Sequence, residues 1–571
     1  MKKNPYSAIT MTHRALAIFL VIFVSIQGIG SAQRLRLEVE TNNQPDDSIA
    51  EIYLPQREYK SRQDIKNALD KFRELLYQAG YLQSTIQNTT QIDSIYKVKF
   101  FSGKRVKLLK LKHNTQHIPE YAKVLKLNSD STYIYIRPEE LQYTLEAFVN
   151  IDLRKGRPFS SYALKHINLF QDTAFAELTV SNNQTQKLNT IVIKGYEKFP
   201  KSFLKHFAKL RTNTLYSEEK VTQSTTYLNE LNFIKQIKQP DILFKNDSTT
   251  LYLYLEKEGS NQFEGFLGFA NKENTNGLRI NGYLNLKLNN TLNYGEELQI
   301  QFRGNGDDQQ QLDASLRMPY IFKSPLSITP SLKLFRQDSS FSNSQTQLKI
   351  DYTWSPKFLV NTQLGQLKSN RLEAGPLAPI ENFTKTILST GFELTGDNST
   401  KAPFEYNYLS FDGGYAIRKI GTQATSQQQF LLNSESSYTF DLNTKHKFYL
   451  KNTTSYISPK RLLENELHRF GGMQTIRGYK ENNFYASFFS TLQTEYRFKP
   501  QNNIIINSVL DAAYYENSIS QQSELFFGVG LGGSILTQAG WLRINIAAPV
   551  SQNNSFETSN TVLHISLLNN F

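Results

Sequence analysis

The chain has 571 residues and contains no cysteine. It can therefore form neither a disulfide nor a cysteine-ligated zinc or iron–sulfur site, and no cysteine is available for a lipid anchor. Methionine and tryptophan are also scarce, with four and two residues. Beyond the N-terminus no segment is apolar enough to predict a membrane-spanning helix, which excludes a helical inner-membrane protein. The chain is rich in Phe and Tyr, with 38 and 31 residues, and it carries a net charge of +13.

The N-terminus has the features of a secretory signal peptide. Three Lys or Arg residues precede an apolar run over residues 15–24, and the small residues Gly30 and Ala32 follow it. The alternative is a transmembrane anchor, but the run is shorter than the ~20 residues needed to span hydrocarbon. We therefore predict a signal peptide over residues 1–32, cleaved after Ala32, and an exported protein.

The next part of the chain, to about residue 258, mixes helical and strand patterns. The pattern is clearest after Leu188, where the strand "LNTIVIKG" precedes helical stretches around residues 201–210 and 217–231. The strands "NFIKQIKQPDILF" and "TTLYLYLEKE" complete an order of strand, helix, helix, strand and strand. Two earlier segments follow this order less regularly, so three tandem units of about 70–80 residues indicate an internal repeat. We place them at residues 33–103, 104–187 and 188–258.

From about residue 261 the helical pattern ends, and short segments of alternating apolar and polar residues recur between polar loops. In "SFFSTLQTEYRF", for example, Leu492 and Tyr496 alternate with Gln493 and Glu495. A soluble β-sandwich also alternates, but the signal peptide, the number of such segments and the strand-like C-terminus favour a membrane barrel. At ~19 residues per strand and loop, the segment 261–571 predicts about 16 strands.

One arginine, Arg477, stands in the glycine-flanked stretch "GGMQTIRGYK" ahead of one of these strands. Parity places Glu495 and Asp511 on the polar, lumen-facing side of two neighbouring strands. A buried unpaired arginine is costly, whereas its planar guanidinium can contact two carboxylates at once. We therefore expect the loop to fold back into the lumen, where Arg477 pairs with Glu495 and Asp511. The flanking glycines would allow tight turns close to the wall.

These residues resemble the loop motif of the BamA/TamA superfamily of outer-membrane assembly proteins. The matching loop residues are Gly471, Gly472, Ile476, Arg477, Gly478 and Tyr479. Glu495 and Asp511 match the family's acidic strand positions, and the terminal Phe571 resembles its C-terminal insertion signal. "GVGLGGSILTQAGWLRINIAAPV" is similar to its penultimate-strand region, and the tandem units resemble POTRA domains. The sequence departs from the family at Ala513, often a glycine, and at Gly532-Gly533, often basic or polar.

The resemblance implies a fold of α+β POTRA repeats (β-α-α-β-β) followed by an all-β antiparallel transmembrane barrel. It places the barrel in the outer membrane of a diderm bacterium and the POTRA domains in the periplasm. The first and last strands, near residues 263–269 and 561–571, would form a seam that opens laterally and templates client strands. One face of the last strand carries Leu563, Ile565, Leu567 and Phe571. The POTRA units would receive unfolded outer-membrane proteins as clients by strand addition.

Other candidate sites are weaker. His113 and His117 in "HNTQH" are four residues apart, as in helical metal sites, but they have no acidic neighbour, so we predict no metal site. We find neither a P-loop nor a Gly-x-Ser-x-Gly elbow, and we predict no enzyme and no cofactor. The basic excess could indicate nucleic acid, but in an exported barrel it fits lipid headgroups or client chains better.

Three functions remain open. The first is an assembly or insertion factor, closer to TamA than to BamA, which usually has five POTRA units; it could work with a TamB-like partner or accessory lipoproteins. The second is a two-partner secretion transporter that exports one dedicated protein. That class normally has two POTRA units and an N-terminal plug helix, whereas "QRLRLEVE" predicts a strand. The third is a passive porin or receptor, which would leave the POTRA-like units and Arg477 without a role.

Overall fold

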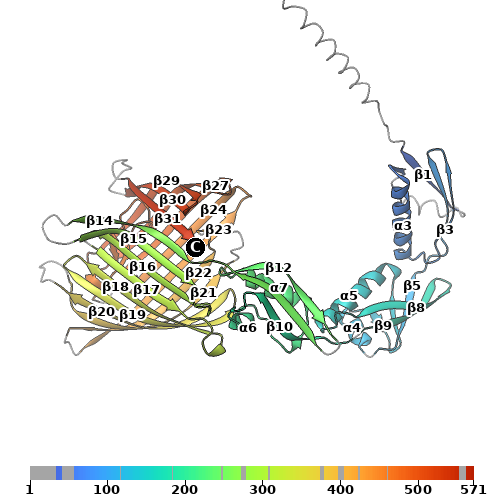
Figure 1. The fold of residues 1–571 in the computed structure, drawn as a ribbon, viewed down its shortest axis with the longest axis horizontal. Helices are drawn as coiled ribbons and strands as arrows, with labels where there is room; N and C mark the ends of the chain where they lie inside the picture. Colours follow the sequence, from blue (N-terminus) through green and yellow to red (C-terminus); the bar gives the residue numbers. More distant parts are fainter. Residues whose placement is uncertain are drawn as a thin grey trace, which may run out of the picture. The chain divides into compact units, whose positions relative to one another are not determined.

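The structure is a computed structural model (Figure 1). It describes residues 34–41, 54, 57–115, 117–182, 184–245, 248–271, 278–306, 309–372, 379–396, 404–421, 425–458, 461–551 and 561–570. The predicted signal peptide over residues 1–32 and Phe571 lie outside the described residues. The chain divides into two compact units, Met1–Gln186 with Leu215–Ser217 and Lys187–Thr214 with Glu218–Phe571. Within the described residues, no helix is long and apolar enough to cross a membrane.

A four-stranded sheet with the strand order β2-β1-β4-β3 opens the first unit. Its elements are β1 (Leu35–Thr41), β2 (Glu58–Tyr59), α3 (Arg62–Gln78), β3 (Thr85–Ile92) and β4 (Ile95–Phe101). Ser61 caps α3 by accepting a hydrogen bond from the Asp64 N–H at 3.2 Å. The predicted apolar face of α3 is buried against the sheet, with the rings of Phe72 and Phe100 5.2 Å apart.

A five-stranded sheet with the order β6-β7-β5-β9-β8 follows in the same unit. Its elements are β5 (Leu108–His113), α4 (Ile118–Val124), β6 (Asn128–Ser129), β7 (Tyr133–Ile136), η2 (Pro138–Glu140), α5 (Leu141–Arg154), β8 (Ser161–Phe170) and β9 (Thr173–Ser181). Asp152 of α5 is buried and accepts hydrogen bonds from the hydroxyls of Tyr121 at 2.6 Å and Tyr162 at 2.5 Å. Burial, with a smaller contribution from Asp152, raises the pKa of both tyrosines. One carboxylate therefore joins α4, α5 and β8.

The third sheet, with the order β11-β10-β13-β12, lies at the start of the second unit. Its elements are β10 (Lys187–Gly195), α6 (Ser202–His206), β11 (Thr214–Leu215), α7 (Glu218–Asn229), β12 (Ile234–Phe244) and β13 (Thr249–Lys257). The helix predicted around residues 201–210 is shorter than expected, because the chain leaves helical geometry and Lys209 adopts a φ of +58°. Gly195 ends β10 at a φ of +92°, where a Cβ would lie 2.4 Å from the Leu255 carbonyl oxygen. Only glycine fits there.

The rest of the second unit is a closed antiparallel barrel of 16 strands, the number predicted from the sequence (Figure 1). The strands are β14 (Gln262–Asn271), β15 (Leu278–Asn289), β16 (Glu297–Gly306), β17 (Gln309–Arg317), β18 (Leu326–Gln337), β19 (Phe341–Ser355), β20 (Phe358–Arg371), β21 (Phe383–Thr395), β22 (Tyr408–Ile420), β23 (Ser426–Asp441), β24 (His446–Ile457), β27 (Phe488–Gln501), β28 (Ile504–Asn517), β29 (Gln522–Thr537), β30 (Gly540–Ser551) and β31 (Val562–Asn570). The fold class predicted from the sequence is confirmed.

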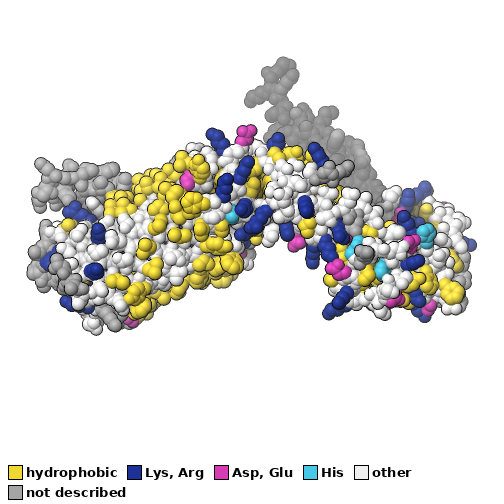
Figure 2. All heavy atoms as spheres, turned by 90° about the horizontal axis from the view of Figure 1, so that it is seen from below, with side chains coloured by type: hydrophobic (Ala, Val, Ile, Leu, Met, Phe, Trp, Pro, Cys, Tyr) yellow, Lys and Arg dark blue, Asp and Glu magenta, His cyan; other side chains and the backbone are white. Residues whose placement is uncertain are grey.

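Side chains alternate along the strands as predicted. On β27 the apolar Leu492 and Tyr496 are exposed on the outer surface, whereas Gln493 and Glu495 are buried towards the lumen. Figure 2 shows hydrophobic side chains gathered on the outer face of the barrel. An apolar exterior around a polar interior is the arrangement of a barrel that spans a lipid bilayer.

The Asp152 cluster generates a stability prediction. Asp152→Ala removes the acceptor of the Tyr121 and Tyr162 hydroxyls and the carboxylate that lies 3.2 Å from Arg157. We expect the free energy of opening of the five-stranded sheet to fall by about 3 kcal/mol. Hydrogen exchange of β5 and β9 in the full chain measures this change. Asp172→Ala, which removes an exposed acid of the β8–β9 turn, is the control and should change exchange little; equal protection in both variants would contradict the prediction.

Candidate functional site

The described residues 461–487, between β24 and β27, contain the Arg477 motif and lie inside the barrel. It contains η4 (Glu464–Glu466) and a small hairpin of β25 (His468–Phe470) and β26 (Phe484–Ala486). At the hairpin, Phe470 stacks on Phe489 of β27 with ring centroids 4.7 Å apart. Ile476 and Phe470 join a buried apolar cluster with wall residues of β27, β28 and β29. We call residues 461–487 the lumen loop.

Arg477 lies at the tip of the lumen loop and is 1% exposed. Its Nε and Nη2 donate to the two carboxylate oxygens of Asp511 at 2.8 and 2.7 Å, and its Nη1 pairs with Glu495. The Arg477 backbone N–H also donates to Asp511 at 2.9 Å. The structure therefore brings Arg477 of the loop together with Glu495 and Asp511, the two carboxylates that alternation along the strands places in the lumen. The backbone and the side chain of Arg477 both bind Asp511. The carboxylate therefore holds the loop in position and also neutralises the arginine.

Glu495 has further partners that the sequence argument did not assign. Arg497 of the same strand donates to it at 2.7 Å, and Arg543 of β30 donates at 2.5 Å. Three guanidinium groups therefore meet around one carboxylate, with Asp511 taking most of the contacts of Arg477. The sequence pattern places Arg497 and Arg543 on the polar face, which is the signal that could have identified them as partners.

Glycine allows the loop to approach the wall. Gly471, Gly472 and Gly478 have φ values of +124°, +90° and +93°, which disfavour residues with a side chain. At Gly478 a Cβ would lie 2.9 Å from the backbone of Ala548. On the wall, a Cβ at Gly528 would lie 2.0 Å from the Arg477 carbonyl oxygen. The loop backbone therefore packs directly on the backbones of β29 and β30, and the Tyr479 hydroxyl donates to the Val550 carbonyl at 3.2 Å.

A second buried ion cluster holds the other end of the lumen loop, and the sequence analysis missed it. Lys385 of β21 and Arg418 of β22 are direct cross-strand neighbours. Two cations placed opposite each other repel unless an anion lies between them. Glu466 supplies that anion: it pairs with Lys385 at 2.7 Å and with Arg418, and Gln429 of β23 donates to it at 3.2 Å. Glu466 and Arg418 have fully buried side chains.

The barrel closes where β14 meets β31, the predicted seam. Among the described residues this ladder has three residue pairs, from Gln262–Asn570 to Glu264–Leu568, whereas β14 and β15 share ten pairs. Leu563 and Ile565 are exposed on the outer face of β31, and Leu567 is half-buried. A cavity of about 970 Å³ is lined both by Leu563 and Ile565 and by lumen residues such as Arg303. The lumen is therefore continuous with the seam beside β31.

The pair His113 and His117 lies elsewhere. His113 is buried at the end of β5, and His117 precedes α4 with its ring 5.2 Å from that of Tyr121. Burial, followed by the charge of Arg157, lowers the pKa of His117. No group of three or more potential metal ligands occurs among the residues that the structure describes.

Comparison with known proteins supports the fold. Residues 186–257 match the POTRA family, described as a surface antigen variable number repeat. CdiB from Acinetobacter baumannii is 14% identical with a TM-score of 0.52, covering 92% of this chain and 99% of that one. CdiB from Escherichia coli is 13% identical with a TM-score of 0.54, covering 89% and 97%. BamA from Haemophilus ducreyi lacking POTRA domains 1-3 is 14% identical with a TM-score of 0.48, covering 82% and 100%. Among curated proteins no match is found.

The POTRA match and the 16-stranded barrel together define the class of protein. It is a β-barrel protein in which a POTRA domain and two further mixed sheets precede the barrel. The chain has the architecture of the BamA/TamA superfamily, so the fold that the resemblance implies is confirmed.

The geometry at Arg477 predicts how the loop responds to substitution. Arg477→Ala leaves the buried Asp511 with only the backbone N–H, so we expect the loop tip to leave the wall. Hydrogen exchange in residues 472–478 should rise by about tenfold or more, because one buried pair contributes more than 1.4 kcal/mol. Arg477→Lys should restore little of the protection, since one ammonium nitrogen cannot reproduce the contacts that Arg477 makes through three separate nitrogens. Arg461→Ala removes an exposed arginine of the same loop and is the control. Wild-type exchange in Arg477→Ala would exclude Arg477 as the residue that holds the loop.

The Glu466 cluster predicts that substitutions of Glu466 and Arg418 have non-additive effects on the free energy of unfolding. Glu466→Gln leaves two buried cations without an anion and should lower the free energy of unfolding by about 3 kcal/mol. Removing one cation as well, in Glu466→Gln/Arg418→Gln, should cost less than the sum of the single changes, because the repulsion also disappears. Urea unfolding of the full chain in lipid vesicles measures each variant, with Glu464→Gln as the control on the same loop. Additive losses would show that Glu466 and Arg418 do not interact.

Proposed function

We propose that this protein is an outer-membrane assembly factor that receives unfolded barrel proteins at its POTRA domains and inserts or translocates them through the seam. Its class supports a role in insertion or transport at the outer membrane. The narrower role as an assembly factor rests on the seam. Neither a cofactor nor an enzymatic step is required.

The short seam supports this proposal most strongly. Three residue pairs close the barrel at β14 and β31, although β14 has ten residues and β31 has nine. The backbone N–H and C=O groups of β14 and β31 beyond that ladder form the kind of strand edge to which another strand adds. The cavity of about 970 Å³ opens on the same edge and offers a route between lumen and seam.

The POTRA sheets offer edges for client capture. The edge strand β8 of the five-stranded sheet exposes large apolar side chains, including Ile167 and Phe170. The edge strand β12 of the third sheet likewise exposes Ile237 and Leu243. An extended client segment could pair with such an edge through its backbone while its apolar side chains contact these residues. A TamB-like partner or accessory lipoproteins remain part of the proposal.

A two-partner secretion transporter is the second candidate, because two CdiB structures share the fold over nearly the whole chain. We favour the assembly factor because three POTRA-like sheets precede the barrel here. Two-partner secretion transporters normally have two POTRA units. In addition, the first described segment is a strand of the first sheet, β1, at the position where those transporters are expected to have a plug helix. A passive porin would have no use for the sheets or the lumen loop.

Depletion of the protein followed by quantitative proteomics of the outer membrane and the medium tests the proposal. We expect many barrel proteins to be lost together from the outer membrane, because a common insertion route is removed. Loss of one large secreted protein with the barrels intact would instead identify a dedicated secretion transporter.

Complementation with a seam-locked variant tests the mechanism in the same cells. Glu264→Cys/Leu568→Cys places two cysteines on a register pair of the seam, and the native chain has no other thiol. We expect the oxidised variant to fail to restore the barrel proteins and a reductant to recover activity. The control, Asn285→Cys/Gln301→Cys, crosslinks a pair within the full β15–β16 ladder and should complement under both conditions. Full activity with the seam crosslinked would exclude lateral opening.

A further inference from the structure

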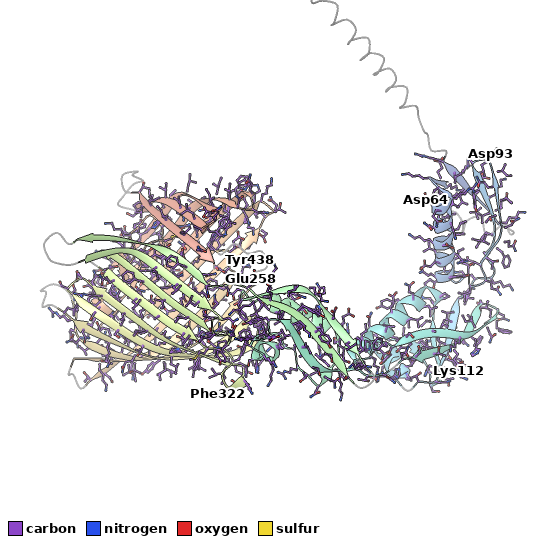
Figure 3. All side chains as sticks on the ribbon, viewed as in Figure 1. Asp64, Asp93, Lys112, Glu258, Phe322 and Tyr438 are labelled. Atoms are coloured by element: carbon purple, nitrogen blue, oxygen red, sulfur yellow. The ribbon has the colours of Figure 1, made fainter. Side chains whose placement is uncertain are left out.

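Three consecutive turns at one end of the barrel expose large apolar side chains. Leu292 and Tyr294 stand in the turn between β15 and β16, and Phe322 stands in the turn between β17 and β18. Trp354 stands at the end of β19. Phe322 is 94% and Trp354 is 69% exposed. Figure 3 labels Phe322 where it projects from this end of the barrel. We call these four residues the apolar rim.

The apolar rim continues the outer apolar surface of the barrel. Along β19, Leu348, Ile350, Tyr352 and Trp354 occupy alternate positions and are all exposed. Because alternate residues of a strand share one face, Trp354 lies on the same outer face as the leucine and isoleucine that precede it. Tyr and Trp at the end of a lipid-facing strand are typical of the membrane–water interface. Trp354 therefore marks the height at which the bilayer ends.

A basic segment of the third sheet's domain is fixed to the same turns. Residues 198–211 contain four lysines and one arginine and no acidic residue. Within it, the Phe203 ring lies 4.8 Å from that of Tyr320, and the His206 ring lies 2.8 Å from the Lys323 carbonyl oxygen through Nε2. Lys209 Nζ donates to the Trp354 carbonyl at 3.1 Å. These contacts lie within the second unit and place positive charge at the level of the rim.

The positive charge of the segment is concentrated and accessible. Lys205, Lys209 and Arg211 are exposed. Burial lowers the pKa of His206, and the charges of these three neighbours lower it further. Figure 2 shows Lys and Arg side chains where the hydrophobic outer surface of the barrel ends. At a bilayer surface, long basic side chains place their stems along apolar groups and their charges at headgroup level.

We propose that the apolar rim and the basic segment 198–211 form a docking surface for anionic lipid headgroups of the periplasmic leaflet. Charge complementarity and continuity with the lipid-facing barrel surface both favour lipid over a protein partner. The surface holds the third sheet's domain against the bilayer on one side of the barrel, at the end of strands β15–β19 where the apolar rim lies. This inference does not depend on the proposed assembly activity, since it concerns only where the domain meets the membrane.

Trp354 offers a direct test, because the chain has only one other tryptophan, Trp541. Trp541→Phe is a conservative change at a half-buried residue that packs on Phe404. The full chain with this substitution is reconstituted in nanodiscs of phosphatidylcholine that contain a fixed minor fraction of brominated lipid. The brominated lipid is either phosphatidylglycerol or phosphatidylcholine, and quenching of Trp354 fluorescence is measured for each.

We expect quenching by the brominated anionic lipid to exceed that by the zwitterionic lipid by about twofold or more, since one basic residue concentrates anionic lipid roughly fivefold. Lys205→Gln/Lys209→Gln/Arg211→Gln should abolish the difference. The control removes the same charge from an exposed part of the same domain, with Lys235→Gln/Lys238→Gln/Lys245→Gln, and should keep it.

Three results would overturn the proposal. Equal quenching by both lipids would mean that the basic segment does not select anionic headgroups. Absence of quenching by either lipid would mean that Trp354 does not reach the bilayer and that the rim faces water or a protein. A difference that survives in the triple variant of the basic segment would also exclude this segment as its cause.

Discussion

At two places the wall of this barrel presents buried charges that take a partner from the lumen loop. On β27, Glu495 pairs with Arg497 and Arg543 of the wall as well as with the loop. On β28, Asp511 pairs with Arg477 of the loop. On β21 and β22 the wall presents the cations Lys385 and Arg418, and the loop supplies Glu466. Each buried charge left alone would be costly, so the wall and the loop require each other.

The wall presents charges of opposite sign in the two clusters, so the loop can bind in only one position. Arg477 cannot take the place of Glu466 between two cations, and Glu466 cannot take the place of Arg477 beside two carboxylates. A loop displaced along the lumen would therefore meet repulsion rather than a second stable position. Close packing adds to this, because the Arg477 carbonyl lies where a side chain on Gly528 would stand. The two ion clusters therefore determine the position of the loop, and the glycines allow its backbone to approach the wall there.

The sequence predicted those features that depend on the period of one strand or on one motif. Alternation was enough to place Glu495 and Asp511 in the lumen and Leu492 on the outer face, because parity along a strand is local. The Glu466 cluster could not be predicted in this way. Lys385 and Arg418 become neighbours only through the register of β21 with β22, and Glu466 reaches them only through the path of the loop. Likewise, helical periodicity predicted too long a helix at residues 201–210, where contacts with the barrel turns fix the chain after His206.

The buried ion pairs of the loop and the seam ladder involve different strands and differ in strength. Glu466 joins the loop to β21–β23, and Arg477 joins it to β27 and β28, both through buried ion pairs. The seam joins β14 to β31 through three residue pairs near one end of the strands. Buried ion pairs resist separation because each charge loses its partner, whereas strand groups at a short ladder can pair with another strand instead. A force that strains the whole barrel therefore acts first on the seam. In the proposed function this difference has a consequence: the loop would preserve the shape of the wall while the seam exchanges partners.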